Sequence, residues 1–247
     1  MQTQAAGSAA AAADAPGKSL PARFAGILFA PRATYAAVAA RPRWLGIFLT
    51  VYIITASAAT ALMSTEVGRN ALLDRQIAQQ ESFGRKMTQE QIDRLERFSV
   101  YFVYATPVLQ FAGFVLGGLV ISGLAFAVFN AILGGDATFK QFFAIVAHSG
   151  VVLAVLSLFT TPLAYARESM ASTTNLAIFL PFLDESSFVA RFLGSIDLIF
   201  IWWIVSLAIG LGVLYRKRTG PIAIAMLSVY AAIGLIIAAV KSVSTGA

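Results

Sequence analysis

Long apolar runs alternate with short polar connections along this chain, and the runs have the length of membrane-spanning helices. The longest, residues 103–133, holds thirty-one residues without one Asp, Glu, Lys or Arg. At a rise of ~1.5 Å per residue, about twenty apolar residues cross a bilayer as a helix. The pattern therefore predicts an all-α, polytopic membrane helical bundle whose membrane domain covers residues 44–240. Its five transmembrane helices are expected at about 44–63, 103–133, 142–166, 196–215 and 220–240.

The connection between the first two spans is strongly polar, with six acidic and six basic side chains between Glu66 and Arg97. Thr88 followed by Gln91 has the pattern of a capping box, which predicts a helix that begins at Gln89. The run 66–82 is the expected partner helix, with Gly84 as the break. We expect an extramembrane helical hairpin over residues 66–98, whose second helix continues without interruption into the second span.

Two kinds of sequence precede the first span. Residues 1–18 are mostly small and polar, which predicts a disordered N-terminal tail. Residues 19–43 place apolar side chains at helical spacing with arginines between them. We interpret this stretch as an N-terminal amphipathic segment, a helix pair lying in the membrane interface; the alternative is a charged flank that only sets topology.

Composition agrees with this architecture and limits the chemistry. The chain is 58% hydrophobic and 12% charged, against roughly 45–50% and 25% in ordinary soluble domains. Zero cysteines exclude thiol chemistry, and a single histidine excludes a metal site built from imidazoles within one chain. No nucleotide loop, nucleophile elbow or paired-carboxylate pattern is present. We therefore expect no enzyme, no catalytic residue, no cofactor and no metal.

The net charge of +6 comes from basic residues beside the apolar spans, which favours contact with membrane lipids over nucleic acid. Three bases fill a four-residue connection between the last two spans, a strong signal for cytoplasmic retention. We therefore expect the N terminus in the cytoplasm and the C terminus outside. The candidate topology and lipid-headgroup residues are Arg32, Arg41, Arg43, Arg216, Lys217 and Arg218.

Two ionisable residues, His148 and Asp197, are polar candidates within the membrane. They could form a proton relay, but the spans place them near opposite membrane faces. The alternative for His148 is a neutral side chain hydrogen-bonded to a neighbouring helix. Asp197 has a structural alternative in the first turn of the fourth span, with Ser195 as the cap and Arg191 as a partner.

Small residues recur at spacings that let helix backbones approach each other. Gly113 and Gly117 form such a face in the second span, and compatible faces occur in the last two spans. We expect a compact bundle rather than an open pore. The helix-packing candidates are Gly113, Gly117, Gly210, Gly212 and Gly234.

Three short motifs resemble one known family of five-span membrane proteins. They are the aromatic and Pro-Arg segment 29–35 with Arg41-Pro42-Arg43-Trp44, the residues Gly135, Thr138, Phe139, Phe142 and Phe143, and Asp197, Leu198, Ile201 and Trp202. In these features the chain resembles bacterial members of the Yip-one (Ypt-interacting protein) domain family over about residues 24–238. Ile199 and Phe200 depart from the family pattern.

The resemblance implies a membrane scaffold or accessory protein of an export or trafficking system, in the bacterial cytoplasmic (inner) membrane. The expected partners are lipids and either a membrane protein or a second copy of the chain. The Asp-Leu-Tyr-Gly-Pro segment of eukaryotic relatives, which act with small GTPases, is absent, which argues against a GTPase partner. The alternative function is a small transporter or lipid-translocating protein that uses His148 and helices broken at Pro107 and Pro162.

Overall fold

The computed structural model describes residues 19–132, 134–184 and 186–245, and these parts form helices and turns without a β-strand. The predicted tail, residues 1–18, lies outside the described residues. The helices are α2 (Leu20–Phe29), α3 (Pro31–Ala40), α4 (Leu45–Met63), α5 (Glu66–Glu81), α6 (Gln89–Ser99), α7 (Phe102–Phe126), α8 (Phe139–Ser149), α9 (Val151–Ala166), α10 (Phe188–Ser195), α11 (Leu198–Leu214) and α12 (Thr219–Thr245). A π-helical turn, η1 (Ala127–Ile132), follows α7, and a 3-10 turn, η2 (Leu176–Phe179), precedes α10.

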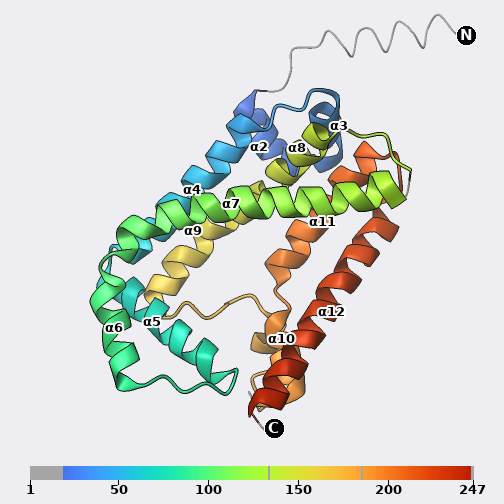
Figure 1. Cartoon of the computed structure of the whole chain (residues 1–247). Coiled ribbons are helices and arrows are strands. Elements are labelled where there is room, and N and C mark those ends of the chain that lie inside the picture. Colours follow the sequence, from blue (N-terminus) through green and yellow to red (C-terminus); the bar gives the residue numbers. More distant parts are fainter. Residues whose placement is uncertain (1–18, 133, 185, 246–247) are drawn as a thin grey trace, which may run out of the picture.

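The core lies where α3, α4, α8, α9 and α11 meet. Ile47 of α4, Phe142 and Ile145 of α8, and Leu207 and Leu211 of α11 are fully buried. These helices are apolar over most of their surface, so the fold buries one side and leaves the other for lipid. Figure 1 shows α4, α8–α9, α11 and α12 running between the two ends of the molecule.

The helix pair α2–α3 is part of this core on one side. Tyr35 and Val38 of α3 are buried against α8 and α11, whereas Phe29 at the end of α2 is 85% exposed. Gln141 of α8 donates its side-chain amide to the Ala39 carbonyl at 3.0 Å. The position of this pair in the membrane interface stays a prediction.

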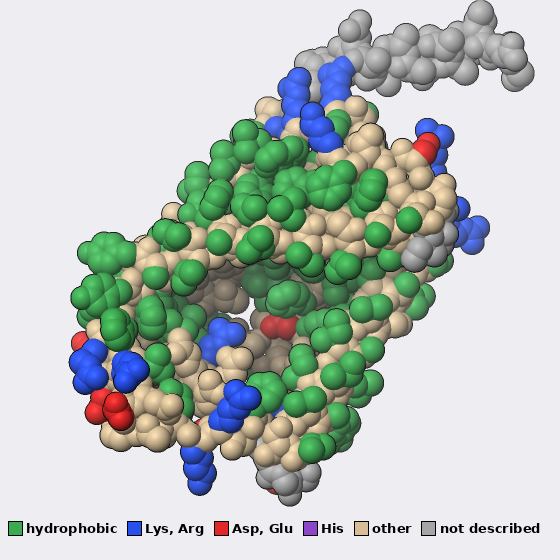
Figure 2. Space-filling model, in the orientation of Figure 1, with side chains coloured by type: hydrophobic (Ala, Val, Ile, Leu, Met, Phe, Trp, Pro, Cys, Tyr) green, Lys and Arg blue, Asp and Glu red, His purple; other side chains and the backbone are tan. Residues whose placement is uncertain are grey.

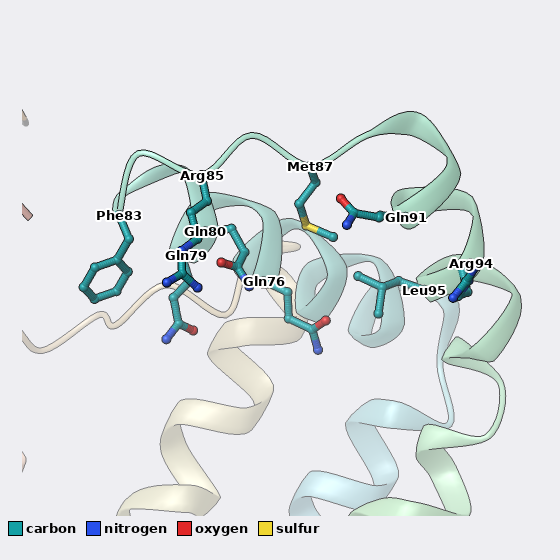
Figure 3. A pocket seen from close by; sticks show the side chains of 9 residues that line it. All are labelled: Gln76, Gln79, Gln80, Phe83, Arg85, Met87, Gln91, Arg94 and Leu95. Carbon is teal, nitrogen blue, oxygen red and sulfur yellow. The ribbon is translucent and has the colours of Figure 1, made fainter. Parts of the chain in front are cut away.

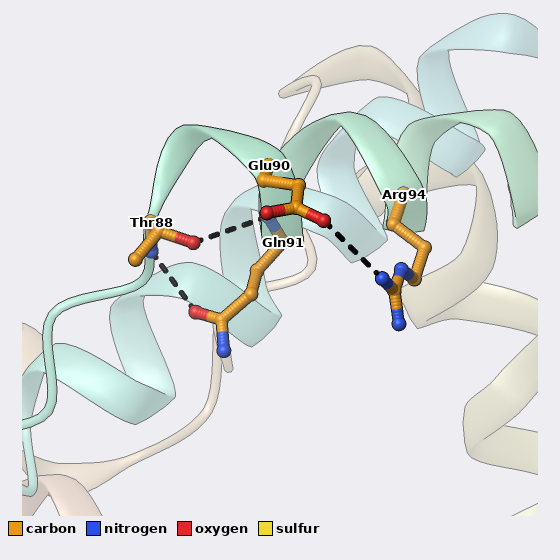
Figure 4. A network of polar contacts seen from close by, with 4 residues as sticks. All are labelled: Thr88, Glu90, Gln91 and Arg94. Carbon is orange, nitrogen blue, oxygen red and sulfur yellow. Dashed lines mark hydrogen bonds and ion pairs between the residues drawn. The ribbon is translucent and has the colours of Figure 1, made fainter.

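The hairpin α5–α6 has the predicted local structure. In α6, Thr88 Oγ1 accepts from the Gln91 backbone N–H and Gln91 Oε1 accepts from the Thr88 backbone N–H, so helix α6 begins at Gln89 (Figure 4). An exposed ion pair, Glu90–Arg94 at 3.4 Å, follows it. Gly84, with φ +71°, lies in the turn that separates α5 from α6.

A pocket of about 610 Å³ lies between the two helices of this hairpin (Figure 3). Gln76, Gln79 and Gln80 line it from α5, and Met87, Gln91, Arg94 and Leu95 line it from the α6 side, with Phe83 and Arg85 of the turn. The tip of the hairpin reaches the end of α12, where Lys241 Nζ lies 5.4 Å from the Phe83 ring centroid.

The prediction of one helix from Gln89 into the second span is wrong. Helix α6 ends at Ser99 and α7 begins at Phe102, with Val100 and Tyr101 in a turn. The turn changes direction, because α6 packs against the polar α5 whereas α7 packs against α4 and α8. Figure 1 shows α7 inclined steeply to α4, α11 and α12. At about 37 Å, a 25-residue helix can still cross ~30 Å of hydrocarbon when tilted.

Four described helical stretches are long and apolar enough to cross a membrane: Leu45–Met63, Phe102–Ala131, Phe139–Ala166 and Thr219–Ser244. The third unites α8 and α9 across Gly150. The fourth predicted span corresponds to α11, an apolar helix of 17 residues that falls short of this length. The membrane bundle is thus present, while the number of five spans depends on α11.

Candidate functional site

Two side-chain hydrogen bonds inside the bundle join helices that are distant in the sequence. The hydroxyls of Tyr35 and Ser206 lie 2.8 Å apart and link α3 to α11. Trp203 donates its indole N–H to Ser149 Oγ at 3.0 Å and links α11 to α8. Burial raises the pKa of the Tyr35 phenol, so this side chain is a neutral hydrogen-bonding group at physiological pH. Both bonds fix the positions of helices.

His148 lies in the last turn of α8 and is fully buried. Its Nδ1 is 2.7 Å from the Ala144 carbonyl of its own helix, so the expected bond to a neighbouring helix is wrong. The carbonyl four residues earlier is already within reach of the ring, and Ser149 makes the interhelical bond instead. Because a carbonyl only accepts, Nδ1 carries the hydrogen, and Nε2 has no partner among the described residues.

Asp197 fastens an irregular loop to the start of α11. Its carboxylate accepts from Ser172 Oγ at 2.6 Å, from Thr174 Oγ1 at 2.9 Å and from the Ile199 backbone N–H at 2.9 Å. The expectation that Ser195 caps this helix is wrong: Asp197 itself is the N-cap, and the Ser195 hydroxyl donates to Phe192 O. With its acceptors used for structure, Asp197 is not a relay partner for His148.

The expected pairing of Arg191 with Asp197 is also wrong. Arg94–Glu90 is the ion pair found within residues 19–132, 134–184 and 186–245, and Arg191 instead donates to Ser242 Oγ of α12 at 3.5 Å. Hydrogen bonds from the backbone and side chain of Ser186 lower the pKa of Asp184, and the charge of Arg191 acts in the same direction. Arg191 therefore serves the contact between α10 and α12.

The predicted packing glycines divide into two groups. Gly210 lies against α8 and α3, since an added Cβ would be 2.5 Å from Ile145 and 3.1 Å from the Tyr35 ring. Gly234 is similarly close to Ser195, and Gly212 faces the turn before α12. At Gly113 and Gly117 an added Cβ would meet nothing within 4 Å. Their packing role therefore stays a prediction about a partner.

Neither candidate proline breaks its helix. Helix α7 continues through Pro107 and α9 through Pro162. The Pro107 carbonyl accepts a hydrogen bond from the Tyr52 hydroxyl at 3.0 Å, so this region is held to α4. The structure thus shows no discontinuous helix at these two positions.

The basic residues predicted to meet headgroups are exposed and lie near one end of the bundle: Arg32, Arg41, Arg43, Arg216, Lys217 and Arg218. Two contacts each hold one of these segments to a neighbouring part of the bundle. Gln141 binds the end of α3 at Ala39, and the Tyr215 hydroxyl donates to Asn130 Oδ1 at 2.6 Å. Arg23 donates to the Arg43 carbonyl at 2.8 Å, and burial together with the Arg43 charge lowers the pKa of Arg23.

Sequence reasoning missed the capping box at the start of α8. Thr138 Oγ1 accepts from the Gln141 N–H, and Gln141 Oε1 accepts from the Thr138 N–H. The Thr-x-x-Gln pattern that revealed the box at Thr88 is the signal that could have found it. Within the described residues no group of three His, Cys, Asp or Glu side chains could hold a metal ion.

The chain was compared with family models, with curated proteins and with solved structures. The family model of the Yip1 domain matches residues 25–240. Neither the curated proteins nor the solved structures compared with the chain contain a match.

Proposed function

The chain belongs to the Yip1 domain family, and we propose that it is a non-enzymatic scaffold or accessory protein of a membrane complex. In this proposal it binds a membrane-protein partner, or a second copy of itself, through helix α7. Such a function needs a membrane-embedded surface that the fold itself leaves free.

The exposure of α7 carries this proposal. Only 6% of the most apolar stretch of α7 is buried, against 11% in α12, 33% in α4 and 67% in α8–α9. Val108, Leu109, Leu116 and Leu124 are each more than 60% exposed. Figure 2 shows that the surface over α4 and α7 is largely hydrophobic. Gly113 and Gly117 line a pocket of about 200 Å³ that α7 forms with α4 and α8–α9, so a partner group that enters it can approach the α7 backbone closely.

The polar groups of the bundle support a structural rather than a chemical function. Tyr35, Ser149 and Asp197 each hold one element against another. The transporter alternative needs a broken helix, and both proline-containing helices are continuous. Reconstituted vesicles separate the two functions, because substrate flux that His148→Ala abolishes cannot come from a scaffold.

The surface of α7 is tested by replacing Gly113 and Gly117 with Leu and by crosslinking in native membranes before purification in mild detergent. The expected result is loss of the co-purified partner or oligomer. Gly220→Leu is the matched control, since Gly220 lies on α12 and an added Cβ there also meets nothing within 4 Å. The proposal is wrong if the double variant retains its crosslinked product at the level of the control.

We also propose that the N terminus is cytoplasmic and the C terminus outside, in a bacterial cytoplasmic membrane. The gathering of basic segments at one end supports this orientation, because cytoplasmic loops carry an excess of Lys and Arg. The segments that carry Arg41 and Lys140 meet through the bond between Gln141 and Ala39.

A further inference from the structure

A groove of about 370 Å³ lies between α4, α7 and the start of α8. Its walls are apolar except for one side chain, Lys140. Trp44, Leu45, Phe48 and Leu49 line it from the α4 side, Phe111, Val115 and Leu119 from α7, and Phe139, Lys140 and Phe143 from α8. Phe48, Phe114 and Phe143 stand between the helices and keep them apart. The ring centroid of Phe48 lies 6.2 Å from that of Phe114 and 6.0 Å from that of Phe143.

The groove is apolar along its length, and Lys140 lines its rim with the hydrocarbon part of its side chain, so the ammonium group lies at the edge of the apolar walls. Trp44 and Lys140 stand at the thresholds of two apolar helices, where interfacial side chains gather. Leu49 lies five residues further along the α4 side, roughly 7 Å deeper along the helix axis. Leu45, Phe111 and Leu119 of the walls are 55%, 44% and 43% exposed, so the groove opens to the surroundings of the bundle. In a membrane those surroundings are lipid chains.

Lys140 breaks a local rule of helix design. It lies in the first turn of α8, where the helix dipole favours acidic side chains, and this turn holds none. Its ammonium group has no carboxylate within ion-pair distance in the described parts of the chain. An anion placed beside Lys140 would meet both the ammonium charge and the positive end of α8. Such local conflicts are typical of binding sites.

We propose that this groove binds one anionic phospholipid, with its phosphate at Lys140 and an acyl chain along Leu45 and Leu49 against α7. The apolar walls suit a hydrocarbon chain, and the single cation suits a negative headgroup. Anionic lipids are enriched in cytoplasmic leaflets, which agrees with the proposed orientation. The site lies on the α4 and α8 side of α7 and does not include Gly113 or Gly117.

The test uses the full chain in nanodiscs of phosphatidylcholine with and without phosphatidylglycerol, followed by release into mild detergent and native mass spectrometry. We expect the wild-type chain to retain phosphatidylglycerol in preference to phosphatidylcholine. Lys140→Gln removes the cation and is expected to weaken phosphatidylglycerol retention about tenfold, the scale of one charged hydrogen bond. Lys140→Arg is expected to keep the preference.

The apolar part of the groove is tested by Val115→Trp, which fills it and is expected to abolish retention of both lipids. Val120→Trp places the same side chain on an exposed position of α7 outside the groove and serves as the control. Helical circular dichroism checks that each variant is folded. If Val115→Trp does not fold, the result with Lys140→Gln alone tests the proposal. Unchanged phosphatidylglycerol retention in Lys140→Gln overturns the proposal, whatever happens to the partner of α7.

Discussion

The Tyr35 hydroxyl meets the Ser206 hydroxyl at 2.8 Å across the contact between α3 and α11, 171 residues apart in the sequence. Gly210, one turn after Ser206, lets the Tyr35 ring approach the α11 backbone. This contact attaches the segment before the first apolar helix to the centre of the bundle. The α2–α3 pair is therefore held by specific packing as well as by any affinity for the membrane surface.

Tyr35→Phe removes this hydrogen bond without changing the ring. We expect the free energy of unfolding in detergent to fall by about 1 kcal/mol, the usual net contribution of a buried hydrogen bond. Ser206→Ala should cost a similar amount, and the double variant should cost less than the sum of both. A double-mutant cycle measured by denaturant unfolding checks this, and strictly additive effects would contradict the coupling.

Gly84 has φ +71°, and a Cβ there would collide with the Ser244 carbonyl oxygen of α12. Gly84→Ala is therefore expected to detach the hairpin tip from α12 and to expose the turn around Phe83 to protease. Gly134→Ala is the matched control, because its φ is +67° but nothing lies within 4 Å of an added Cβ. Both variants place a Cβ on a residue with positive φ and so strain the backbone. Only Gly84→Ala also disrupts the contact with Ser244.

Limited proteolysis of detergent-solubilised protein measures this difference. Cleavage near Arg85 and Lys86 should accelerate in Gly84→Ala and stay at the wild-type rate in Gly134→Ala. Equal acceleration in both variants would show that strain alone, rather than the contact with Ser244, governs the turn.

Local rules account for the parts of the fold that the sequence predicts well. A capping box and a glycine depend on residues within one turn, so the start of α6 at Gln89 and the break at Gly84 are readable from the chain. The prediction that α6 continues into α7 failed because no Pro or Gly marks the turn at Val100 and Tyr101. Tertiary packing decides the direction of the chain there.

The side-chain contacts of the candidate site depend on long-range geometry. Asp197 meets Ser172 and Thr174, which lie 25 and 23 residues earlier, before η2 and α10, and no periodic pattern connects them. The same is true of Trp203 and Ser149, 54 residues apart. Residue type alone identified Asp197 as a candidate, but only the fold shows that hydroxyl groups, rather than Arg191, are its partners.

Asp197→Ala removes the N-cap of α11 and both hydroxyl contacts. We expect a loss of about 1 kcal/mol from the cap alone and faster amide exchange at Leu198 and Ile199 and in the loop 172–176. Hydrogen exchange with mass spectrometry measures both regions. Asp184→Ala, which removes an exposed carboxylate bonded only to Ser186, is the control and should leave α11 unchanged. Unchanged exchange at α11 in Asp197→Ala would contradict the role of Asp197 as the N-cap of this helix.

The side on which the C terminus lies depends on α11. Its 17 residues extend about 25 Å, less than the ~30 Å of a typical hydrocarbon core, so α11 crosses only if the bilayer thins or its ends extend the apolar length. The next turn carries three exposed bases, which favour the cytoplasm. We therefore expect a periplasmic phosphatase reporter fused after Ala247 to be active and green fluorescent protein fused there to be dark. The same reporters inserted at Arg218 should give the reverse result. Cytoplasmic signals at both positions would mean that α12 does not cross the membrane. Periplasmic signals from the reporters at Arg218 would mean that α11 does not cross it.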